Sequence, residues 1–588
     1  MTVGILQKIR KIKLNRLYEE WVWISRYMRR YAMQIVFYIL LGISGTLLGL
    51  AGSLISKQVI DAVTGYNSAS ILPIAALYAG MGILTIAINA VTSQISTRVQ
   101  TKVHQEIRAD VFNHILMADW ESIADYHSGD LLNRATDDAG TVASAVLGFV
   151  PDLITSSVMF AGALAIIIYY DPVMALIALG SSPVMALCSR FLMRKIRAFQ
   201  MESRKISSEI TSFNEESFQN VQFIKSLELA NLFSFKMRAL QQKSYDFIMR
   251  HNLFSIGASS VMSLIGRLIS YACYGWSVYR LWSGDITYGT MMLFLQLAGS
   301  LMGSFNALVG IVPKMLSAGT SARRVMDIVQ LPREDRQYDR QADTLKRQPA
   351  AGMEILLDHV HFSYMNKHTV MTDVTMHIAP GEMIGVVGPS GQGKTTLLRI
   401  LLGLVNVSQG TASIYPAGDT ASAIPIGPST RKLFTYVPQD NMLFSGTVAE
   451  NLRIVKPEAA DEELISALRD ACMDEEILSL PDGLNSRIGE RGHGFSEGQA
   501  QRISLARALL CDAPVLLLDE VTSALDTATE RRVLDHLKKH GSHKTIIFTT
   551  HRLSVLDMCT HVFEITDRHL SQISKHDYHE YLLRTKIS

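Results

Sequence analysis

Cysteine is scarce in this sequence, and the few cysteines are not arranged in closely spaced pairs. They lie far apart, at Cys188, Cys273, Cys472, Cys511 and Cys559. The sequence therefore has neither the CxxC spacing of a zinc site nor the dense pattern of a disulfide framework. We expect free thiols, as in a protein that lies in a bilayer or faces a reducing cytosol.

The sequence also lacks an excess of charge of either sign. The formal net charge is +2 at pH 7, so the charge balance does not indicate nucleic-acid binding. A chain of 588 residues is too long for one core, and two or three domains are expected. The hydrophobic fraction of 48% is high for a soluble enzyme, and most of the excess falls before residue 315.

Charged residues are missing from long stretches of the first half of the chain. Five stretches contain no Asp, Glu, Lys or Arg and a sixth contains only Arg267; together they cover residues 31–56, 62–97, 153–170, 172–189, 252–279 and 286–313. A helix needs about 20 apolar residues to cross the hydrocarbon core of a membrane. Because only helices and closed barrels satisfy the backbone in lipid, these lengths predict six transmembrane helices.

Basic residues gather in two long loops between the predicted spans, near 98–140 and 190–250. The other loops are short and almost free of basic residues, so the long loops and both ends of the membrane domain are expected in the cytoplasm. Both loops have a helical pattern, and we expect their tips, near 119–126 and 214–224, to contact the domain formed by the second half of the chain. The aromatic and charged segment 14–30 predicts a helix in the inner membrane interface.

Polar side chains inside the predicted spans are candidates for lining a cavity in the membrane. Arg267 lies in mid-span, where a charged side chain costs about 2.5–3.5 kcal/mol on insertion scales. We expect it either to face a watery cavity or to pair within the membrane, for example with Asp152. In the last span Gln296, Ser300 and Ser304 share one helical face, which lines either the cavity or a helix contact.

A polar, proline-containing stretch at 331–352 is interpreted as a linker, and strand-like and helix-like runs alternate after it, as in an α/β domain. A buried strand at 383–387 leads into a glycine-rich loop and then a helix, the setting of a phosphate-binding loop. Backbone N–H groups of such a loop hold phosphates, and its lysine adds a positive charge. The predicted nucleotide-binding residues here are Gly388, Pro389, Ser390, Gly391, Gln392, Gly393, Lys394, Thr395 and Thr396.

A second buried strand, 515–518, ends in two carboxylates. Asp519 is a predicted Mg²⁺ ligand together with Thr395, and Glu520 is placed to polarise the water that attacks the γ-phosphate. Phosphoryl transfer depends mainly on position and electrostatics, so paired acids beside a phosphate loop indicate nucleotide hydrolysis. The alternative, a helix N-cap, is a weaker interpretation with the phosphate loop upstream.

The remaining motifs fall in the order and spacing of the ATP-binding cassette. They are Tyr364, Gln439, the signature Phe495–Gln499, Ser523–Asp526 and His551. With six spans ahead of the cassette, residues 15–588 resemble an ATP-binding cassette exporter half-transporter. The resemblance implies a multi-domain fold: an all-α, six-helix transmembrane domain of the type I exporter kind and an α/β P-loop nucleotide-binding domain. The expected boundaries are 1–30 (basic segment and interfacial helix), 31–330 (transmembrane domain), 331–352 (linker) and 353–588 (nucleotide-binding domain).

The resemblance also implies roles for single residues. Tyr364 resembles the aromatic side chain that stacks on adenine, Gln439 the glutamine that contacts the metal and the water, and His551 the histidine that contacts the γ-phosphate. The implied catalytic residues are thus Glu520, His551 and Gln439, and the implied metal ligands are Thr395, Gln439 and Asp519. In the signature, Ser496, Gly498 and Gln499 resemble the groups that meet ATP held by a second subunit, and segment 486–492 resembles an exporter-specific loop.

Two departures from the family pattern stand out. Phe495 and Glu497 replace the leucine and the first glycine of the usual signature, and a carboxylate that pointed toward a triphosphate would slow closure of the site. Segment 416–430 is rich in Pro, Gly, Ala and Ser where the family has a more regular strand and turn, and we expect a change in a surface loop only.

The function implied by the resemblance is ATP-driven export by alternating access, with ATP and Mg²⁺ bound between two half-transporters in a bacterial plasma membrane. A homodimer is preferred because Lys394, Glu520 and His551 are all present; a heterodimer is the alternative. Uptake through the same fold and a channel gated by ATP are the rival functions, whereas six spans exclude a soluble ATPase. Lipids, amphiphilic drugs and peptides remain open as cargo, and nucleic acid is not expected as a partner.

Overall fold

The structure is a computed structural model that describes residues 18–65, 71–347, 352–364, 369–389, 391–439, 442–489, 494–540 and 544–574. Side chains at 181–198, 200, 201, 204, 262, 312 and 540 lie outside this description. The chain divides into two compact units, and we describe each by itself. The membrane unit comprises Met1–His114 and His127–Gln330, and the nucleotide unit comprises Ile115–Tyr126 and Leu331–Ser588.

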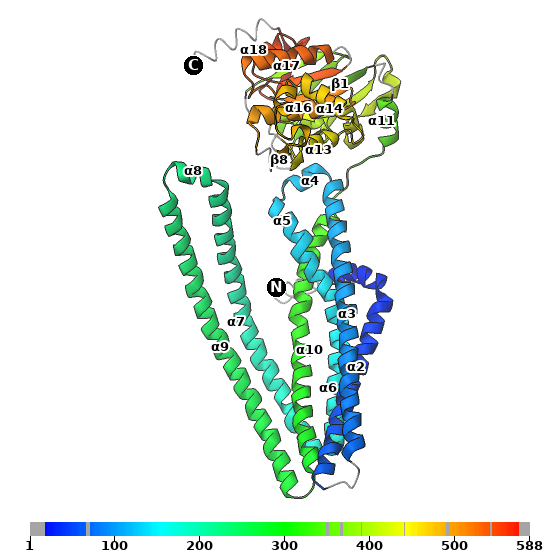
Figure 1. The fold of residues 1–588 in the computed structure, drawn as a ribbon, viewed down its shortest axis with the longest axis vertical. Helices are drawn as coiled ribbons and strands as arrows, with labels where there is room; N and C mark the ends of the chain where they lie inside the picture. Colours follow the sequence, from blue (N-terminus) through cyan, green and yellow to red (C-terminus); the bar gives the residue numbers. More distant parts are fainter. Residues whose placement is uncertain are drawn as a thin grey trace, which may run out of the picture. The chain divides into compact units, whose positions relative to one another are not determined.

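Long helices make up the membrane unit (Figure 1): α2 (Ala32–Val63), α3 (Ile71–Met117), α6 (Ala139–Tyr170), α7 (Pro172–Gln219), α9 (Ala230–Trp282) and α10 (Tyr288–Val329). Within the described part of the chain, five helical segments are long and apolar enough to cross a membrane. They contain the apolar runs of α2, α3, α6, α9 and α10, so the predicted helical transmembrane domain is confirmed. The remaining run, 172–189, lies in α7, and many side chains of this helix fall outside the description.

Two of these helices form a long hairpin. At 1.5 Å per residue, the 48 residues of α7 and the 53 residues of α9 span about 70–80 Å, more than twice the thickness of a hydrocarbon core. The tip carries the short helix α8 (Val221–Ser226) and lies a few residues later than expected, because α7 continues through Gln219. Apolar side chains at this tip are exposed, among them Phe218, Val221 and Phe223.

A buried aspartate fixes the other end of the hairpin. The Oδ1 atom of Asp171 accepts hydrogen bonds from the backbone N–H of Val173 at 2.9 Å and of Met174 at 3.2 Å, which caps the first turn of α7. Its Oδ2 atom accepts from the indole Nε1 of Trp276 on α9 at 3.0 Å. One carboxylate therefore starts α7 and holds it against α9.

Residues 18–30, for which a helix in the membrane interface is predicted, form a helix. Trp23, Ile24 and Tyr27 are buried, and the Tyr27 hydroxyl donates to Asp110 Oδ2 of α3 at 3.0 Å. This helix therefore packs on the helical bundle through its aromatic face.

Ionic contacts join two segments of the membrane unit that are distant in the sequence. Arg324 of α10 bonds Asp130 Oδ1 of α5 (Ser128–Asn133) at 2.7 Å and Asp138 Oδ2 at 3.2 Å. Asp138 ends a single π-helical turn, η1 (Arg134–Asp138), and also accepts from the Ser321 hydroxyl at 2.8 Å. The network ties α5 and η1 to α10.

The nucleotide unit contains two main sheets (Figure 1). An antiparallel sheet has the order β2-β1-β4-β5, formed by β2 (Thr369–Ile378), β1 (Met353–Ser363), β4 (Gln409–Pro416) and β5 (Ile424–Pro425). The second has the order β12-β11-β3-β10-β9-β6 and is parallel except for β12, formed by β12 (His569–Ile573), β11 (His561–Thr566), β3 (Met383–Val387), β10 (Thr545–Thr549), β9 (Val515–Asp519) and β6 (Phe434–Val437). A short pair joins β7 (Gly446–Thr447) and β8 (Arg487–Ile488).

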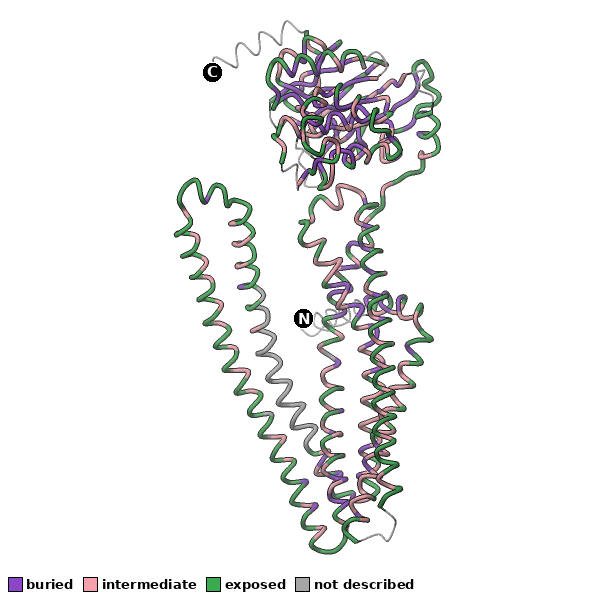
Figure 2. The backbone as a smooth tube through the Cα atoms, viewed as in Figure 1, coloured by how far each residue is buried: buried purple, intermediate pink, exposed green. Residues whose placement is uncertain are grey.

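Every residue of β3, β9 and β10 is buried, as expected for strands covered on both faces. The helices of this unit are α12 (Lys394–Leu401), α13 (Val448–Arg453), α14 (Asp461–Asp470), α15 (Asp474–Leu478), α16 (Glu497–Leu510), α17 (Thr527–His540) and α18 (Leu553–Leu556). Figure 2 shows buried residues throughout this unit, whereas exposed and half-buried residues predominate along the long helices of the membrane unit.

Two segments differ from what the sequence indicated. Stretch 331–352, interpreted as a linker, contains α11 (Asp339–Lys346), whose Ala342 and Leu345 belong to a core of the nucleotide unit. Segment 416–430 is more than a surface loop, because it includes β5 and buries Ile424 and Thr430.

The tip of the first long loop forms α4 (Trp120–Ala124) and belongs to the nucleotide unit. An antiparallel bridge joins Ala118 to Arg333, and the N–H of Asp119 donates to the carbonyl of Pro332 at 2.9 Å. Trp120 packs on the core that contains the antiparallel sheet. The predicted contact between this loop tip and the nucleotide domain is confirmed.

Candidate functional site

The glycine-rich loop connects β3 to α12 through backbone conformations that favour glycine. Gly388 has φ +144°, and a Cβ there would lie 2.5 Å from the carbonyl oxygen of Ile565. Gly393 has φ +111° and precedes α12 directly. The loop therefore turns sharply and points the N-terminus of α12 at the place where phosphates are expected. Ser390, a predicted ligand, lies outside the described residues.

Lys394 is buried and bonded within the loop. Its Nζ donates to the carbonyls of Gly388 at 2.7 Å and Pro389 at 3.3 Å, and it lies 3.1 Å from Nε2 of His551. Burial lowers the pKa of Lys394, while the carboxylates of Glu520 and Asp519 oppose that shift. Lysine and histidine thus meet at one place, although 157 residues separate them in the sequence.

The electrostatics of His551 favour its neutral form. Burial lowers its pKa first and the Lys394 ammonium second, while Glu520 Oε1, 3.6 Å from Nε2, opposes the shift. A neutral ring can accept the lysine hydrogen bond at Nε2. Phosphate oxygens brought here would reverse this balance and favour the charged ring.

Asp519, at the end of β9, is buried and accepts hydrogen bonds from three hydroxyl groups. Thr395 and Tyr436 each donate to its Oδ2 at 3.2 Å, and Thr549 donates to its Oδ1. Because parallel strands end at the same edge, Tyr436 near the end of β6 and Thr549 at the end of β10 flank Asp519 on both sides. Tyr436 and Thr549 were not predicted from the sequence, because the strand order that puts them beside β9 differs from the order along the chain.

Glu520 has φ +51°, a strained conformation for a residue with a side chain. Its backbone N–H donates to the carbonyl of Thr549 at 3.0 Å and to the Thr549 hydroxyl at 3.2 Å. Its carboxylate accepts from Nε2 of Gln439 at 2.9 Å. The strain therefore places the acid between the phosphate loop and the predicted glutamine.

The donor atoms present suit Mg²⁺. Thr395 Oγ1, the Asp519 carboxylate and the Gln439 side-chain carbonyl are hard oxygen ligands, and the first two already lie 3.2 Å apart. Among the described residues no cluster of three or more His, Cys, Asp or Glu side chains could hold a metal without help. A Mg²⁺ site takes few protein ligands and completes its shell with substrate phosphates and water.

Tyr364 follows β1 and is half-buried against Phe362, with ring centroids 4.8 Å apart. Its hydroxyl lies 3.3 Å from Thr396 Oγ1 and accepts from Arg399 NH1 at 3.0 Å. The aromatic side chain predicted to stack on adenine is thus hydrogen-bonded to α12, the helix that begins at the phosphate loop. Arg399 was not singled out from the sequence.

The signature segment forms the start of α16. The Ser496 hydroxyl accepts from the N–H of Gln499 at 3.3 Å, and the Gln499 side chain accepts from the N–H of Ser496 at 2.8 Å, which makes a capping box. At Gly498 a Cβ would approach the carbonyl of Ala524 to 2.8 Å. Glu497 is exposed on the first turn. In the exporter-specific loop 486–492, residues 490–492 lie outside the description.

The predicted cavity residues have different surroundings. Arg267 and Gln296 are exposed, the Ser300 hydroxyl donates to the carbonyl of Gln296 at 3.1 Å, and Ser304 is buried and bonds within α10. Among the described residues, Asp152 pairs with Lys314 at 3.6 Å, so its suggested pairing with Arg267 is wrong.

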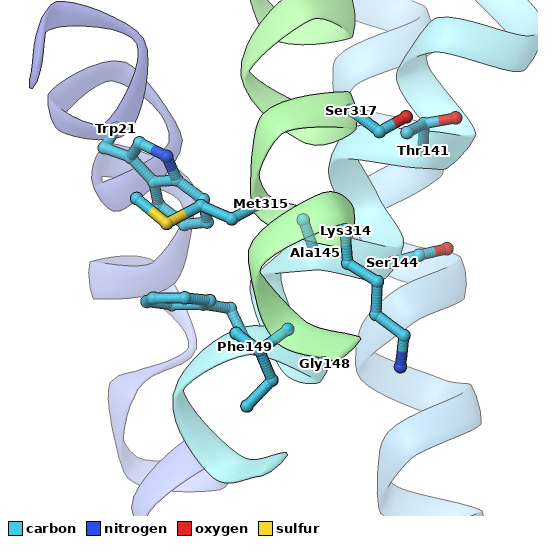
Figure 3. A pocket seen from close by; sticks show the side chains of 10 residues that line it. Trp21, Thr141, Ser144, Ala145, Gly148, Phe149, Lys314, Met315 and Ser317 are labelled. Atoms are coloured by element: carbon cyan, nitrogen blue, oxygen red, sulfur yellow. The ribbon is translucent and has the colours of Figure 1, made fainter. Parts of the chain in front are cut away.

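A pocket of about 360 Å³ lies between helix 18–30, α6 and α10 of the membrane unit, and none of the four predicted cavity residues lines it (Figure 3). Trp21, Phe149 and Met315 give it an apolar side, and hydroxyl groups with one lysine give it a polar side: Thr141, Ser144, Ser317 and Lys314. The pocket therefore combines an apolar side with a polar side.

Comparison with known proteins agrees with this arrangement. Residues 35–305 match the family of the ABC transporter transmembrane region, and residues 371–523 match the ABC transporter family. YgaD of Bacillus subtilis, named as a multidrug export ATP-binding/permease protein, is 27% identical over 565 residues, which cover 94% of this chain and 95% of that protein. The multidrug resistance-like ATP-binding protein MdlA of Buchnera aphidicola is 27% identical, with 80% of each chain covered.

Among solved structures, a bacterial Atm1-family ABC exporter with ATP bound is similar in fold, with a TM-score of 0.78 and 20% sequence identity. The similarity covers 95% of this chain and 98% of that one. The order of the two matched regions, membrane helices first and ATP-binding domain second, is that of a fused half-transporter. The chain therefore belongs to the ATP-binding cassette transporters and joins their transmembrane region and their ATP-binding domain in a single exporter-type polypeptide.

Proposed function

We propose that this chain is one half of an ATP-driven exporter that moves a lipid, an amphiphilic drug or a peptide out of a bacterial cell by alternating access. The observation that carries the proposal is that Lys394, Asp519, Glu520 and His551 converge at one edge of the parallel sheet. The same chain contains helices of membrane-spanning length. The names of its relatives, which refer to multidrug export, support the direction of transport.

Each residue of the site has a role that its contacts support. The Glu520 carboxylate orients and polarises the attacking water, with Gln439 beside it. Lys394 and His551 carry hydrogen-bond donors to the γ-phosphate, and Tyr364 supports the adenine ring. Bound Mg²⁺, held by Thr395, Asp519 and Gln439, would neutralise part of the phosphate charge.

A second copy of the chain would complete the site. The phosphate loop opens α12 and the signature opens α16, and by family resemblance the two serve different ATP molecules. Ser496, Gly498 and Gln499 would then face the ATP of the partner subunit. The presence of Lys394 and Glu520 in this chain favours a homodimer with two active sites.

Closing two sites around ATP can move the membrane helices only if ATP binds the closed state more tightly than the open state. Hydrolysis would remove that difference and reset the transporter. The polar and apolar sides of the membrane pocket support an amphiphilic cargo. The expected location is the plasma membrane, with the nucleotide unit in the cytoplasm.

The decisive experiment is Glu520→Gln in the full-length protein in liposomes. General-base removal costs about 10²–10⁴-fold, so kcat for ATP should fall by at least about 100-fold while the Kd for ATP changes little. Glu462→Gln, on the exposed first turn of α14, is the matched control and should keep full activity. Unchanged ATP hydrolysis in Glu520→Gln would refute the proposed function.

Inside-out vesicles separate export from uptake. Accumulation of a fluorescent amphiphilic dye inside such vesicles with ATP indicates export, and ATP-driven loss of preloaded dye indicates uptake. Activity of the purified chain by itself supports the homodimer, whereas activity that appears only with a second polypeptide indicates a heterodimer.

A further inference from the structure

One arginine of the nucleotide unit touches both the loop tip and the expected adenine site. The guanidinium carbon of Arg399 lies 4.9 Å from the ring centroid of Trp120, a cation–π contact. NH1 of the same side chain donates to the Tyr364 hydroxyl at 3.0 Å. All three residues belong to the nucleotide unit.

The geometry of α12 explains why Arg399 can make both contacts. Thr396 and Arg399 are three residues apart and share a face of the helix, and both reach the Tyr364 hydroxyl. The planar guanidinium can stack on a ring with its face and donate with its edge, which a lysine ammonium cannot do.

Backbone hydrogen bonds fix the loop tip to the segment that follows α10. Backbone hydrogen bonds run from Asp119 to Pro332 at 2.9 Å and from Glu334 to Met117 at 3.0 Å, on both sides of the bridge at Ala118. The backbone at Trp120 is therefore held in place next to these bonds, and the half-buried indole ring contacts Arg399 directly.

We propose that Arg399 is a positioning residue that couples occupation of the base site at Tyr364 to the loop tip at Trp120. This inference rests on the proposed function, which places adenine against Tyr364. A base that stacks on Tyr364 fixes the orientation of the tyrosine ring and its hydroxyl group. The Arg399 side chain, which is bonded to that hydroxyl, then changes position, and the contact with the Trp120 ring changes with it. The contacts from Tyr364 through Arg399 to Trp120 would respond to binding of the adenine base. Gln439, which is bonded to Glu520, lies instead on the phosphate side of the site.

Tryptophan fluorescence tests the coupling in the full-length protein in nanodiscs. The chain has five tryptophans, and Trp120 is the sole one in sequence ranges 115–126 and 331–588, so the part of the signal lost in Trp120→Phe belongs to Trp120. Two probes are added separately: Mg-ADP, which has a base, and Mg-tripolyphosphate, which has none. We expect ADP to change the Trp120 emission and tripolyphosphate to leave it unchanged.

Arg399→Leu should abolish the ADP-induced change in Trp120 emission. The matched control is Arg431→Leu: Arg431 bonds Glu334 at 2.9 Å, close in sequence to the bridge, and should leave the ADP response intact. A response to ADP that persists in Arg399→Leu, or an equal response to tripolyphosphate, would overturn the proposal.

Linkage provides a second test that a purely structural role would not pass. If Trp120 and ADP are coupled through Arg399, then Trp120→Ala and Arg399→Leu should each change the Kd for ADP in the same direction by about fivefold, equal to about 1 kcal/mol. The double variant should show no larger change than either single one. Additive effects contradict the coupling.

Calorimetry with ADP separates the two possible failures. If ADP binds the unaltered protein but Trp120 does not respond, the coupling is wrong and the proposed nucleotide site stands. If ADP does not bind, both the proposed function and the coupling are wrong.

Discussion

Thr549→Val tests whether the hydroxyl that links the two acids of the site matters for catalysis. The Thr549 hydroxyl donates to Asp519 Oδ1 and accepts from the backbone N–H of Glu520 at 3.2 Å. Thr549 is 1% exposed and Asp519 is 3% exposed, so water cannot easily replace the lost group. Valine has nearly the same shape, so the substitution removes the hydrogen bonds and leaves the packing in place.

The expected size follows from the charge of the acceptor. A hydrogen bond to a charged group contributes about 1.5–3 kcal/mol, and we take about 2 kcal/mol here. If the whole contribution positions Asp519 and Glu520 in the transition state, kcat falls about 30-fold, because each 1.36 kcal/mol corresponds to a factor of ten. The lost hydrogen bonds position the two acids for the transition state and do not contribute to binding of ATP in the ground state. KM for ATP should therefore change much less than kcat.

Thr545→Val is the matched control for the ATPase assay. Thr545 lies at the other end of β10, is 2% exposed, and its hydroxyl accepts from the N–H of Gly381 at 3.1 Å, away from the acids. It should lower the midpoint of thermal unfolding as Thr549→Val does, yet keep kcat within about twofold. If both variants lower kcat equally, or if Thr549→Val leaves kcat unchanged, the assigned role of Thr549 is wrong.

Three further predictions concern other parts of the molecule. Burial and Lys394 lower the pKa of His551, so between that lowered pKa and about 6.5 the unfolded chain binds more protons than the folded chain. The stability measured by thermal unfolding should therefore fall as the pH drops below about 6.5. His551→Gln should make this fall smaller. Gly388→Ala should abolish ATP binding in a filter assay, because φ +144° and a backbone carbonyl 2.5 Å from the new Cβ forbid the side chain; normal binding would contradict this. Arg324→Leu leaves Asp138, which is 7% exposed, without its cation. The substitution should destabilise the membrane unit by about 1–3 kcal/mol, less than for a fully buried pair because Arg324 is partly exposed. The test compares its temperature of half-aggregation with that of Arg323→Leu, a substitution at an exposed neighbour.

Much of the nucleotide site could be predicted because its key residues lie in local patterns. A strand, a glycine-rich turn and a helix are consecutive in the sequence, so Lys394 and Thr395 are recognisable without a fold. Asp519 and Glu520 are equally visible at the end of an apolar run. Patterns of this kind need only local chain geometry.

Thr549, Tyr436 and Arg399 could not be predicted in the same way. Their roles depend on which strands are neighbours, and the order β3-β10-β9-β6 differs from the order along the chain. Arg399 looks like an ordinary polar residue of α12 until Trp120, 279 positions earlier, is placed beside it. Long-range pairings of this kind leave no periodic signal in a single sequence.

The boundary of the nucleotide unit has the most direct mechanical consequence. α3 is one continuous helix from Ile71 to Met117, yet the unit boundary falls between His114 and Ile115. The chain enters the nucleotide unit again at Leu331, directly after α10, and the bridge between Ala118 and Arg333 joins these two entries. The covalent chain and these hydrogen bonds therefore connect the end of α3 to the segment that follows α10. Trp120 lies two residues from Ala118, so the coupling proposed for Arg399 would act next to this bridge.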